Sequence, residues 1–412
     1  TLVAQAQKNR ASRNLGPVID SIPARPCGVR GGFYNPRMYS PDPLSAPAAP
    51  LLQGLNPEQL AAVTLPSGHA LILAGAGSGK TRVLTTRIAW LLQNGHATPG
   101  GILAVTFTNK AAKEMVARLT AMLPVNVRGM WIGTFHGLCN RLLRAHHKAA
   151  NLPQAFQILD TQDQLSAIKR LCKQFNVDEE RFPPKQLQWF ISGCKEDGLR
   201  PGDVEVRDGE SRKKAEIYQL YEEQCQREGV VDFGELMLRS YELLRDDAHL
   251  RHHYQRRFQH ILVDEFQDIN RVQYEIVRML ARPENNLFIV GDDDQSIYAF
   301  RGANVGNMMS FVQEFRIGEP IRLEQNYRSQ GNILDAANAL ISNNSERMGK
   351  NLWTDAGKGE KIRANRSDND FDEARFVCST IQEYIDKGVS PKDIAILYRS
   401  NAQSRLFETE LT

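Results

Sequence analysis

The segment from Ala74 to Thr81 constrains the fold of this chain more than any other. It reads Ala-Gly-Ala-Gly-Ser-Gly-Lys-Thr, with an apolar, strand-like segment at 70–74 before it and a helix-like segment at 81–92 after it. Strand, glycine-rich loop and helix in this order direct backbone N–H groups and a helix N-terminus toward a polyphosphate. A flexible Gly/Ser turn is the alternative reading. The flanking segments disfavour it, although Ala74 stands where the strict pattern has glycine.

We call residues 74–81 the glycine loop, and its side chains point to nucleotide chemistry. Lys80 can reach the outer phosphates, and the Thr81 hydroxyl can bind a magnesium ion. The residues expected around the nucleotide here are Gly75, Ala76, Gly77, Ser78, Gly79, Lys80, Thr81 and Arg82.

A pair of carboxylates far along the chain supplies the second part of such a site. Ile261-Leu262-Val263 predicts a short buried strand, which delivers Asp264 and Glu265 at its carboxyl end. Ligands of open α/β sheets collect at that edge. Asp264 would hold magnesium directly or through water, and Glu265 would orient and deprotonate the water that attacks the γ-phosphate. Adjacent carboxylates are common on surfaces, so the pair gains its meaning from the strand and the glycine loop.

Composition limits the class of protein. The 412 residues suffice for two or three domains, and 42% hydrophobic with 24% charged residues is typical of a soluble globular protein. No apolar run approaches the roughly 18 residues of a membrane span, and the first 50 residues lack the apolar stretch of a signal peptide. The six cysteines are scattered, which disfavours a zinc or iron–sulfur site and fits the reducing cytoplasm.

Charge is unevenly distributed along the chain. The formal net charge is only +3, yet residues 1–50 carry six basic and two acidic side chains together with eight of the nineteen prolines. We expect this segment to be a disordered extension. Its charge could tether nucleic acid, and a solvated tail without a task is the alternative. Any nucleic-acid binding by the rest of the chain must come from local placement of charge.

Apolar segments at 70–74, 101–106, 261–264 and 287–291, with helical segments between them, predict a parallel α/β sheet. The nearly strand-free region around 137–226 predicts an all-helical insertion. A second α/β pattern begins near Ile321. The expected division is 1–50 extension, 51–136 and 228–318 sheet domain, 137–227 helical insertion, and 319–412 second α/β domain, with a helix at 370–387 and a strand at 393–399.

Two strand ends carry an aromatic residue beside hydroxyl and amide groups. Val105–Ala112 and Gly133–His136 each end a strand and begin a helix. Bases of a single strand can stack on such rings while polar groups bind phosphate. Core packing of Phe107 and Phe135 is the alternative. A basic cluster follows, for which we weigh a solvated helix face against contact with DNA phosphates: Arg141, Arg144, His146, His147 and Lys148.

Two further segments complete the pattern. In Gly291–Ala303, directly after a strand, Gln295 could reach the γ-phosphate while Tyr298 and Phe300 could stack bases. Leu323–Ser329 offers Arg328 from what we expect to be a neighbouring domain, and an arginine so placed stabilises transition-state charge.

With these elements the chain resembles the UvrD/Rep/PcrA family of superfamily 1 DNA helicases. The resemblance runs in the family's order from about Leu52 to Thr412. The matching elements are the Gln59 segment, the glycine loop, Thr106–Met115, Gly133–His136, Leu262–Asp268, Val290–Ala303 and Leu323–Ser329.

The resemblance implies an α/β fold. A RecA-like parallel sheet domain carries the helical insertion, and an incomplete second RecA-like domain follows. It implies that Gln59 reads the adenine edge, that Tyr327 stacks on the base and that Arg301 connects nucleotide state to the DNA groove. ATP and Mg²⁺ are the implied cofactors. The implied catalytic residues are Lys80, Glu265, Gln295 and Arg328 as arginine finger. The implied nucleotide and metal residues add Gln59, Tyr327, Thr81 and Asp264 to the glycine loop. The implied DNA-binding residues are Phe107, Thr108, Asn109, Thr134, Phe135, His136, Tyr298, Phe300 and Arg301, with Phe300 where the family usually has Trp.

The implied activity is that of an ATP-dependent 3′–5′ helicase or single-strand translocase of DNA repair. The implied partners are single-stranded DNA, single-strand/duplex junctions and DNA-repair proteins, with a monomeric or weakly oligomeric chain and no membrane. The family continues with a large insertion and two further motifs, so we expect the second motor domain to be cut partway and unwinding to be impaired. A non-catalytic ATP- and DNA-binding module is the alternative. A helicase–nuclease is disfavoured because the residues present hold no nuclease-like carboxylate and lysine cluster.

Overall fold

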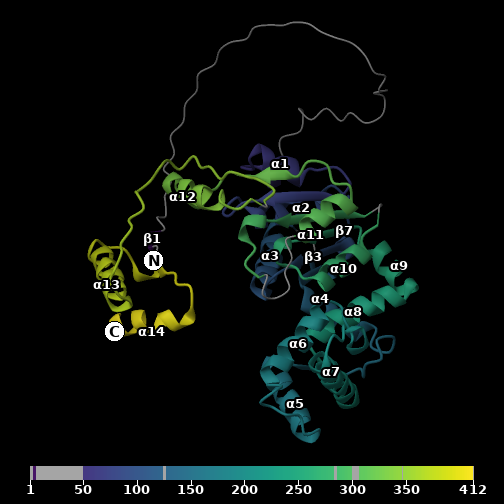
Figure 1. Cartoon of the computed structure of the whole chain (residues 1–412). Coiled ribbons are helices and arrows are strands. Elements are labelled where there is room, and N and C mark those ends of the chain that lie inside the picture. Colours follow the sequence, from purple (N-terminus) through teal and green to yellow (C-terminus); the bar gives the residue numbers. More distant parts are fainter. Residues whose placement is uncertain are drawn as a thin grey trace, which may run out of the picture. The chain divides into compact units, whose positions relative to one another are not determined.

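The computed structural model describes residues 3–5, 50–123, 127–282, 285–298, 306–345 and 347–411. They fall into two compact units. The larger unit comprises Ala48–Arg328 and Leu334–Asp355, and the smaller one holds the remaining described residues. Figure 1 labels the elements of both units.

A six-stranded sheet organises the larger unit. Every neighbouring pair is parallel, and the order is β4-β3-β7-β8-β2-β9. The four inner strands are buried along their whole length, which explains why they appear in the sequence as continuous apolar runs. The bounds are β2 (Ala70–Ala74), β3 (Ile102–Thr106), β4 (Trp131–Thr134), β7 (His260–Val263), β8 (Asn286–Gly291) and β9 (Ile321–Leu323).

The pleat of β2 divides its side chains between two cores. Leu71 and Leu73 face one core, and Ile72 and Ala74 face the other. Helices cover both faces, as expected of a parallel sheet, and the RecA-like α/β class predicted from the sequence is confirmed. One face packs on α1 (Pro57–Val63), α2 (Lys80–Gln93) and α3 (Asn109–Met122). The other packs on α4 (Phe135–Ala145), α8 (Phe233–Asp246), α9 (Ala248–Arg257), α10 (Arg271–Leu280) and α11 (Gly306–Glu314).

The helical part of the larger unit has a core of its own, which includes Ile168, Leu171, Ile191 and Tyr221. It contains α5 (Thr161–Gln174), α6 (Pro184–Glu196) and α7 (Gly209–Glu228), which project from the sheet body in Figure 1. These helices account for the helical character that the sequence predicts for this region. A short parallel ladder joins β5 (Gln157–Leu159) to β6 (Val230–Asp232), and α8 and α9 continue the helical run beyond 227 before the sheet resumes.

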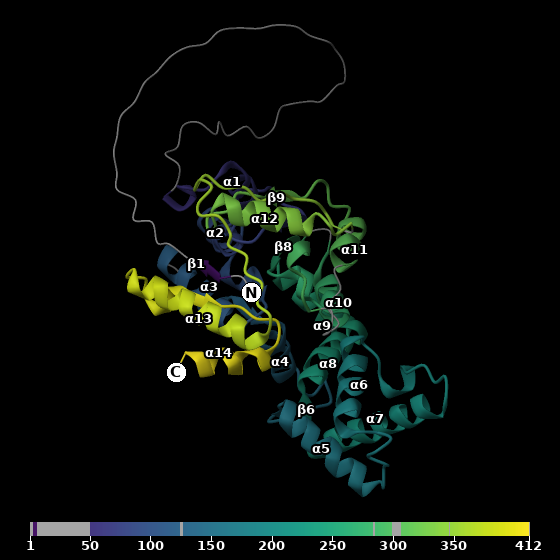
Figure 2. The ribbon, with the colours of Figure 1, turned by 60° about the vertical axis from the view of Figure 1, so that its left-hand side comes forward.

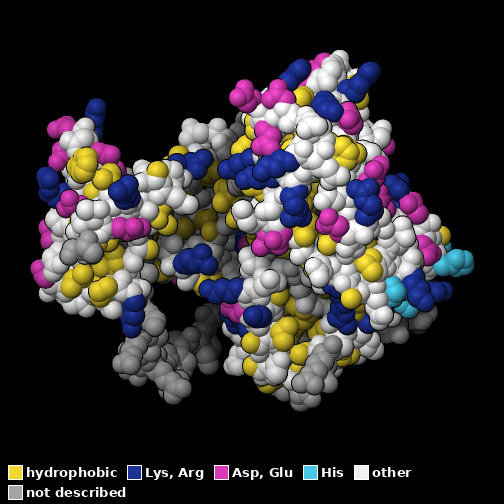
Figure 3. All heavy atoms as spheres, turned by 90° about the horizontal axis from the view of Figure 1, so that it is seen from below, with side chains coloured by type: hydrophobic (Ala, Val, Ile, Leu, Met, Phe, Trp, Pro, Cys, Tyr) yellow, Lys and Arg dark blue, Asp and Glu magenta, His cyan; other side chains and the backbone are white. Residues whose placement is uncertain are grey.

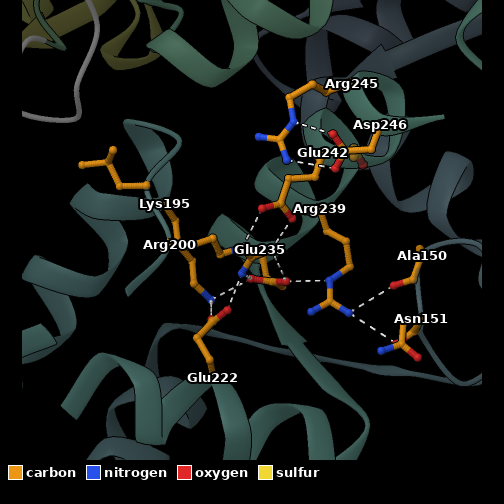
Figure 4. Close-up of polar contacts among 12 residues, drawn as sticks. Ala150, Asn151, Lys195, Arg200, Glu222, Glu235, Arg239, Glu242, Arg245 and Asp246 are labelled. Atoms are coloured by element: carbon orange, nitrogen blue, oxygen red, sulfur yellow. Dashed lines mark hydrogen bonds and ion pairs between the residues drawn. The ribbon is translucent and has the colours of Figure 1, made fainter. Parts of the chain in front are cut away.

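A buried ionic network joins α6, α7 and α8. The ammonium of Lys195 lies 2.7 Å from Glu222, 2.9 Å from Asp232 and 3.0 Å from Glu235. Arg200 forms ion pairs with three glutamates, which are Glu222, Glu235 and Glu242. Figure 4 shows the side chains of Lys195, Arg200, Glu222 and Glu235 converging. Each buried charge of the network therefore has opposite charges beside it, as charges removed from water require.

Strand β9 corrects the expected position of Ile321. The sequence suggested that this strand opens a second α/β sheet, but it pairs in parallel with β2, with Ile321 opposite Ile72 and Leu323 opposite Ala74. The backbone groups along that side of β2 therefore have a partner, which an exposed edge would lack. The loop that follows β9 consequently begins inside the larger unit.

The smaller unit contains α13 (Asp370–Asp386) and α14 (Ser404–Glu410), which lie side by side in Figure 2. Ala374, Val377, Ile381 and Phe407 form their shared core. Strand β10 (Ile394–Ile396) pairs antiparallel with β1 (Val3–Gln5). Apart from residues 3–5 and Pro50, the proposed extension lies outside the described residues. Helix α12 (Gly331–Ile341) spans the boundary in sequence. No helix among the described residues combines the length and apolar character needed to cross a membrane.

Candidate nucleotide site and nucleic-acid face

The glycine loop joins β2 to α2, as the sequence predicts. Gly77 and Gly79 have φ angles of 69° and 88°, which favour glycine, and α2 begins at Lys80. A Cβ added to Gly77 would lie 2.8 Å from the Cβ of Arg328, so glycine is needed there for close approach as well. The Ser78 hydroxyl donates to the Gly75 carbonyl at 2.7 Å. The first N–H groups of α2 are left without helical partners, which is the arrangement that receives phosphate.

Gln59 braces this loop. Its side chain is buried, and its Nε2 donates to the Ser78 carbonyl at 2.8 Å. Its Oε1 accepts from the Asn56 backbone N–H, which completes a capping box at the start of α1. The amide expected to read the adenine edge is therefore engaged with the glycine loop and with the cap of α1. The sequence indicated that Gln59 belongs to the site but not this contact.

Lys80 and Glu265 meet at the centre of the site. The Lys80 ammonium lies 2.8 Å from Glu265 Oε2, and Gln267 Nε2 donates to the same oxygen at 2.8 Å. Glu265 has φ 51°, a left-handed conformation that is uncommon for a residue with a side chain. Its N–H donates to Asp264 Oδ1 at 3.0 Å. The expected strand-end carboxylates thus lie at the glycine loop.

Three carboxylates, those of Asp264, Glu265 and Asp268, surround the single ammonium of Lys80. Carboxylate oxygens are ligands that Mg²⁺ prefers. Burial, followed by the charge of Glu265, raises the pKa of Asp264 to about 7, while Lys80 lowers it. The same causes raise the pKa of Asp268 to about 6. Asp268 Oδ1 is buried and has no hydrogen-bond partner among the described residues. A divalent cation here would relieve this excess negative charge, so the residues present fit Mg²⁺.

Gln267 links the catalytic carboxylate to the turn after β8. Its Oε1 accepts from the Asp292 N–H at 2.9 Å, and the Asp292 carboxylate accepts from the Gln295 amide. Gln295 is therefore linked to Gln267 through Asp292. Its expected contact with the γ-phosphate stays a prediction. Sequence reasoning did not single out Gln267, although its place two residues after Glu265 in a strand-end loop was the available signal.

The loop after β9 lies against the glycine loop. Asn326 Nδ2 donates to the Ala76 carbonyl at 2.6 Å, and the Tyr327 N–H donates to the Gly77 carbonyl at 3.0 Å. The Tyr327 ring is 56% exposed and so is free to cover a base. Arg328 follows on the same loop. Arg328 is the last residue of the Ala48–Arg328 segment, so it belongs to the same compact unit as Lys80. That a neighbouring domain offers this arginine to the nucleotide stays a prediction.

Two aromatic pairs lie at the strand ends expected to contact nucleic acid. Phe107 is 39% exposed and its ring lies 5.0 Å from that of Tyr298. The rings of His136 and Phe233 lie 5.6 Å apart, edge to face. Phe233 is 44% exposed and was missed in the sequence. Its signal was an aromatic residue directly after the short apolar strand β6.

The other residues expected to contact DNA lie at helix N-termini, in the core or outside the described residues. Thr108 and Thr134 use their hydroxyls to cap α3 and α4, and Asn109 is exposed at the start of α3. Phe135 is a correction: only 8% of it is exposed, and its ring packs in the core beneath the sheet, as the alternative reading held. Phe300 and Arg301 lie outside the described residues.

The basic cluster at the end of α4 is largely committed to local packing. Arg141 lies over the Trp131 ring at 4.3 Å. Arg144 lies over Phe156 at 3.6 Å and donates to its carbonyl at 2.7 Å. His146 contacts the Tyr254 hydroxyl, His147 contacts the Leu152 carbonyl, and Lys148 is exposed. Most of these side chains contact neighbouring residues of the same unit, which differs from both a solvated helix face and a surface for DNA phosphates.

Comparison with known proteins agrees with this geometry. The family model for the UvrD/REP helicase N-terminal domain matches residues 55–316, and that for the UvrD-like helicase C-terminal domain matches residues 321–412. The chain is 53% identical to DNA helicase II of Haemophilus influenzae and of Escherichia coli, over 88% of this chain and 50% of each relative. It is 44% identical to the ATP-dependent DNA helicase PcrA of Bacillus subtilis, over 88% of this chain and 49% of that protein. The chain thus spans about half the length of these relatives. It belongs to the UvrD/Rep/PcrA family of DNA helicases.

Proposed function

We propose that this chain binds and hydrolyses ATP at the glycine loop and couples hydrolysis to movement along single-stranded DNA. The observation that carries the proposal is the convergence of three elements on one loop. They are Lys80 within it, Glu265 at 2.8 Å from Lys80, and the Tyr327–Arg328 segment bonded to its backbone. A lysine that reaches the phosphates, a carboxylate that orients the attacking water and an arginine that stabilises charge are groups that catalyse phosphoryl transfer.

Binding of ATP begins with exchange of the Lys80 partner. When phosphate enters the glycine loop, the Lys80 ammonium leaves Glu265 for the phosphate oxygens, and Glu265 becomes free to accept a proton. The Tyr327 ring covers the base, and Gln59 forms the edge of the base site from α1. Thr81 and Asp264 would hold Mg²⁺, which screens phosphate charge when bound.

Hydrolysis then depends on a general base held in place. Glu265 accepts the proton of the attacking water, while its bond from Gln267 Nε2 fixes the carboxylate. Gln295 contacts the γ-phosphate when ATP is bound, and its hydrogen bonds through Asp292 and Gln267 link that contact to Glu265. Arg328 stabilises developing charge from within the same unit, as an arginine supplied in cis does.

The DNA path runs over the aromatic pairs. Phe107 with Tyr298, and His136 with Phe233, offer ring surface on which bases stack without regard to sequence. Figure 3 shows Lys and Arg side chains interspersed with acidic ones on the face that it presents. In this proposal the chain acts in the cytoplasm, in DNA repair, on single strands and single-strand/duplex junctions with 3′–5′ polarity, as a monomer or weak oligomer.

Phosphate release by the purified chain, with and without a single-stranded oligonucleotide, tests the proposal. The proposal expects hydrolysis that the oligonucleotide stimulates and that Phe107→Ala makes less responsive. Leu340→Ala, at a side chain that is 74% exposed on α12, is the matched control for loss of surface apolar area. ATP binding without stimulated hydrolysis would favour the non-catalytic binding module instead.

A further inference from the structure

A second ionic cluster lies at the turn that carries Gln295. Asp292, Asp293 and Asp294 follow β8 and place their carboxylate oxygens within 4.8 Å of one another. Three adjacent carboxylates would repel each other and a nearby polyphosphate. A single ammonium occupies their centre, that of Lys350, at 2.6 Å from Asp292, 2.7 Å from Asp293 and 2.7 Å from Asp294.

Lys350 is a buried lysine on the segment that follows α12. Its side chain is only 2% exposed. Burial lowers the pKa of Lys350, but the three carboxylates outweigh burial and raise it above its usual value. The lysine therefore stays charged and buried, which requires that its partners remain in place. Arg347 reinforces the cluster by donating to both oxygens of Asp294, at 2.9 and 2.6 Å.

The residues that follow Lys350 continue to the glycine loop. We call residues 347–353 the strap. The Asn351 N–H donates to Glu324 Oε1 at 2.8 Å, and the Trp353 carbonyl accepts from the Asn326 N–H at 2.7 Å. Leu352 lies directly over Gly75, where an added Cβ would approach Leu352 Cδ2 to 2.1 Å. The strap thus contacts the Gln295 turn at one end and, at the other, both the glycine loop and the segment that leads to Tyr327 and Arg328.

A continuous set of contacts therefore joins the strap to the catalytic carboxylate. From Lys350 it passes to Asp292, whose N–H is bound by Gln267, and Gln267 donates to Glu265. The Asp292 carboxylate also holds the Gln295 amide. We propose that Lys350 is a positioning residue of the ATPase site, which fixes the Gln295 turn and ties it through the strap to the glycine loop. This inference rests on the proposed function for its kinetic consequence, but not for its structural one.

The test compares Lys350→Met with Lys350→Arg. Methionine keeps most of the length of the side chain and removes its charge, whereas arginine keeps the charge. Lys173→Met, at an exposed lysine of α5, is the matched control. Three quantities are measured for each variant: amide hydrogen exchange of residues 292–295 without nucleotide, kcat and KM for ATP well below the melting temperature, and the melting temperature itself.

The expected result separates positioning from stability alone. In Lys350→Met the turn amides exchange faster, and kcat falls by about tenfold or more because Gln295 and Glu265 lose their fixed geometry. Lys350→Arg restores most of kcat, and Lys173→Met matches the unmodified chain. A Lys350→Met chain with a lower melting temperature but unchanged exchange and kcat would overturn the proposal.

The test of Lys350 also covers a variant that does not fold and a chain without ATPase activity. If Lys350→Met does not fold, Lys350→Met/Asp293→Asn replaces it with the same expectations, because one carboxylate fewer is left without its cation. If the unmodified chain hydrolyses no ATP, the proposed function fails, while hydrogen exchange at 292–295 still decides whether Lys350 positions the turn.

Discussion

Glu265 shows how single residues of the site combine strain and charge. Its backbone adopts φ 51°, and its carboxylate is held by Lys80 and Gln267. Left-handed backbone at a residue with a side chain costs roughly 1–3 kcal/mol and persists only where neighbours enforce it. The strain aims the carboxylate at the glycine loop instead of letting it extend into solvent.

Glu265→Gln tests this role directly. Glutamine keeps the shape and the bond with Gln267 but cannot accept a proton at neutral pH, so ATP binding should persist while kcat falls by about 10²–10⁴-fold. Phosphate release and nucleotide binding are measured in parallel, with Glu179→Gln at an exposed position as the control. A Glu265→Gln chain that still turns over at the original rate would remove Glu265 as the base.

At the residue scale, the sequence predicted the groups that backbone context alone positions. Lys80 and Thr81 follow from a strand–loop–helix pattern, and Asp264 and Glu265 follow from the end of a buried strand. The sequence could not show that the Gln59 amide donates to the Ser78 carbonyl, or that Phe135 is buried in the core while Phe107 is exposed. Those outcomes depend on which direction a ring or amide faces after packing, and neighbouring residue types do not encode it.

Strand β9 is the element whose placement changes the account most. Three residues at 321–323 extend the sheet beyond β2 and bring the loop with Tyr327 and Arg328 against the glycine loop. The inner strands were predictable because each is buried along its whole length and contains a run of three to five apolar residues. A three-residue edge strand with one buried residue carries too little pattern for its partner to be inferred, so the sequence assigned it to the next domain.

The ionic network among α6, α7 and α8 predicts an unequal response to two lysine substitutions. Lys195→Met leaves buried Asp232 and Glu235 without their shared cation and should lower the free energy of unfolding by about 3–5 kcal/mol. Lys213→Met removes only a surface pair with Glu216 and should cost less than about 1 kcal/mol. Urea unfolding followed by circular dichroism measures both, and equal effects would mean that the network adds nothing beyond a surface pair.

His260 predicts how stability depends on pH. It lies buried in β7, and burial lowers its pKa to about 4, with a weak bond to the His96 carbonyl opposing and Arg87 reinforcing the shift. The unfolded chain binds the proton near pH 6.5, so stability is fully present above that pH and is lost as pH falls toward 4.

Between pH 7.5 and pH 5 this group alone should lower the free energy of unfolding by about 2 kcal/mol. Urea unfolding of the unmodified chain and of His260→Gln at the two pH values checks it. The variant should lose less stability than the unmodified chain over that interval, and parallel losses in both would assign the pH dependence to other groups.

At the scale of the whole molecule, one unit carries the described nucleotide-site residues from Gln59 to Arg328. This concentration follows from the sheet, whose order brings β2, β7, β8 and β9 together, so that strand ends distant in sequence meet at one edge. The fold class was predictable because alternating strands and helices admit few arrangements. The strap and its Lys350 cluster were not, because charges on a connecting segment have no periodic pattern.

The proposed function requires that the glycine loop bind the phosphates of ATP through Lys80. Calorimetric titration of the chain with a slowly hydrolysed ATP analogue and Mg²⁺ measures this binding, with Lys80→Ala as the variant and Lys173→Ala as the control. We predict saturable binding of one nucleotide by the unmodified chain and by the control, and a loss of affinity of about tenfold or more in Lys80→Ala. Equal affinity in all three chains would show that Lys80 does not bind the nucleotide.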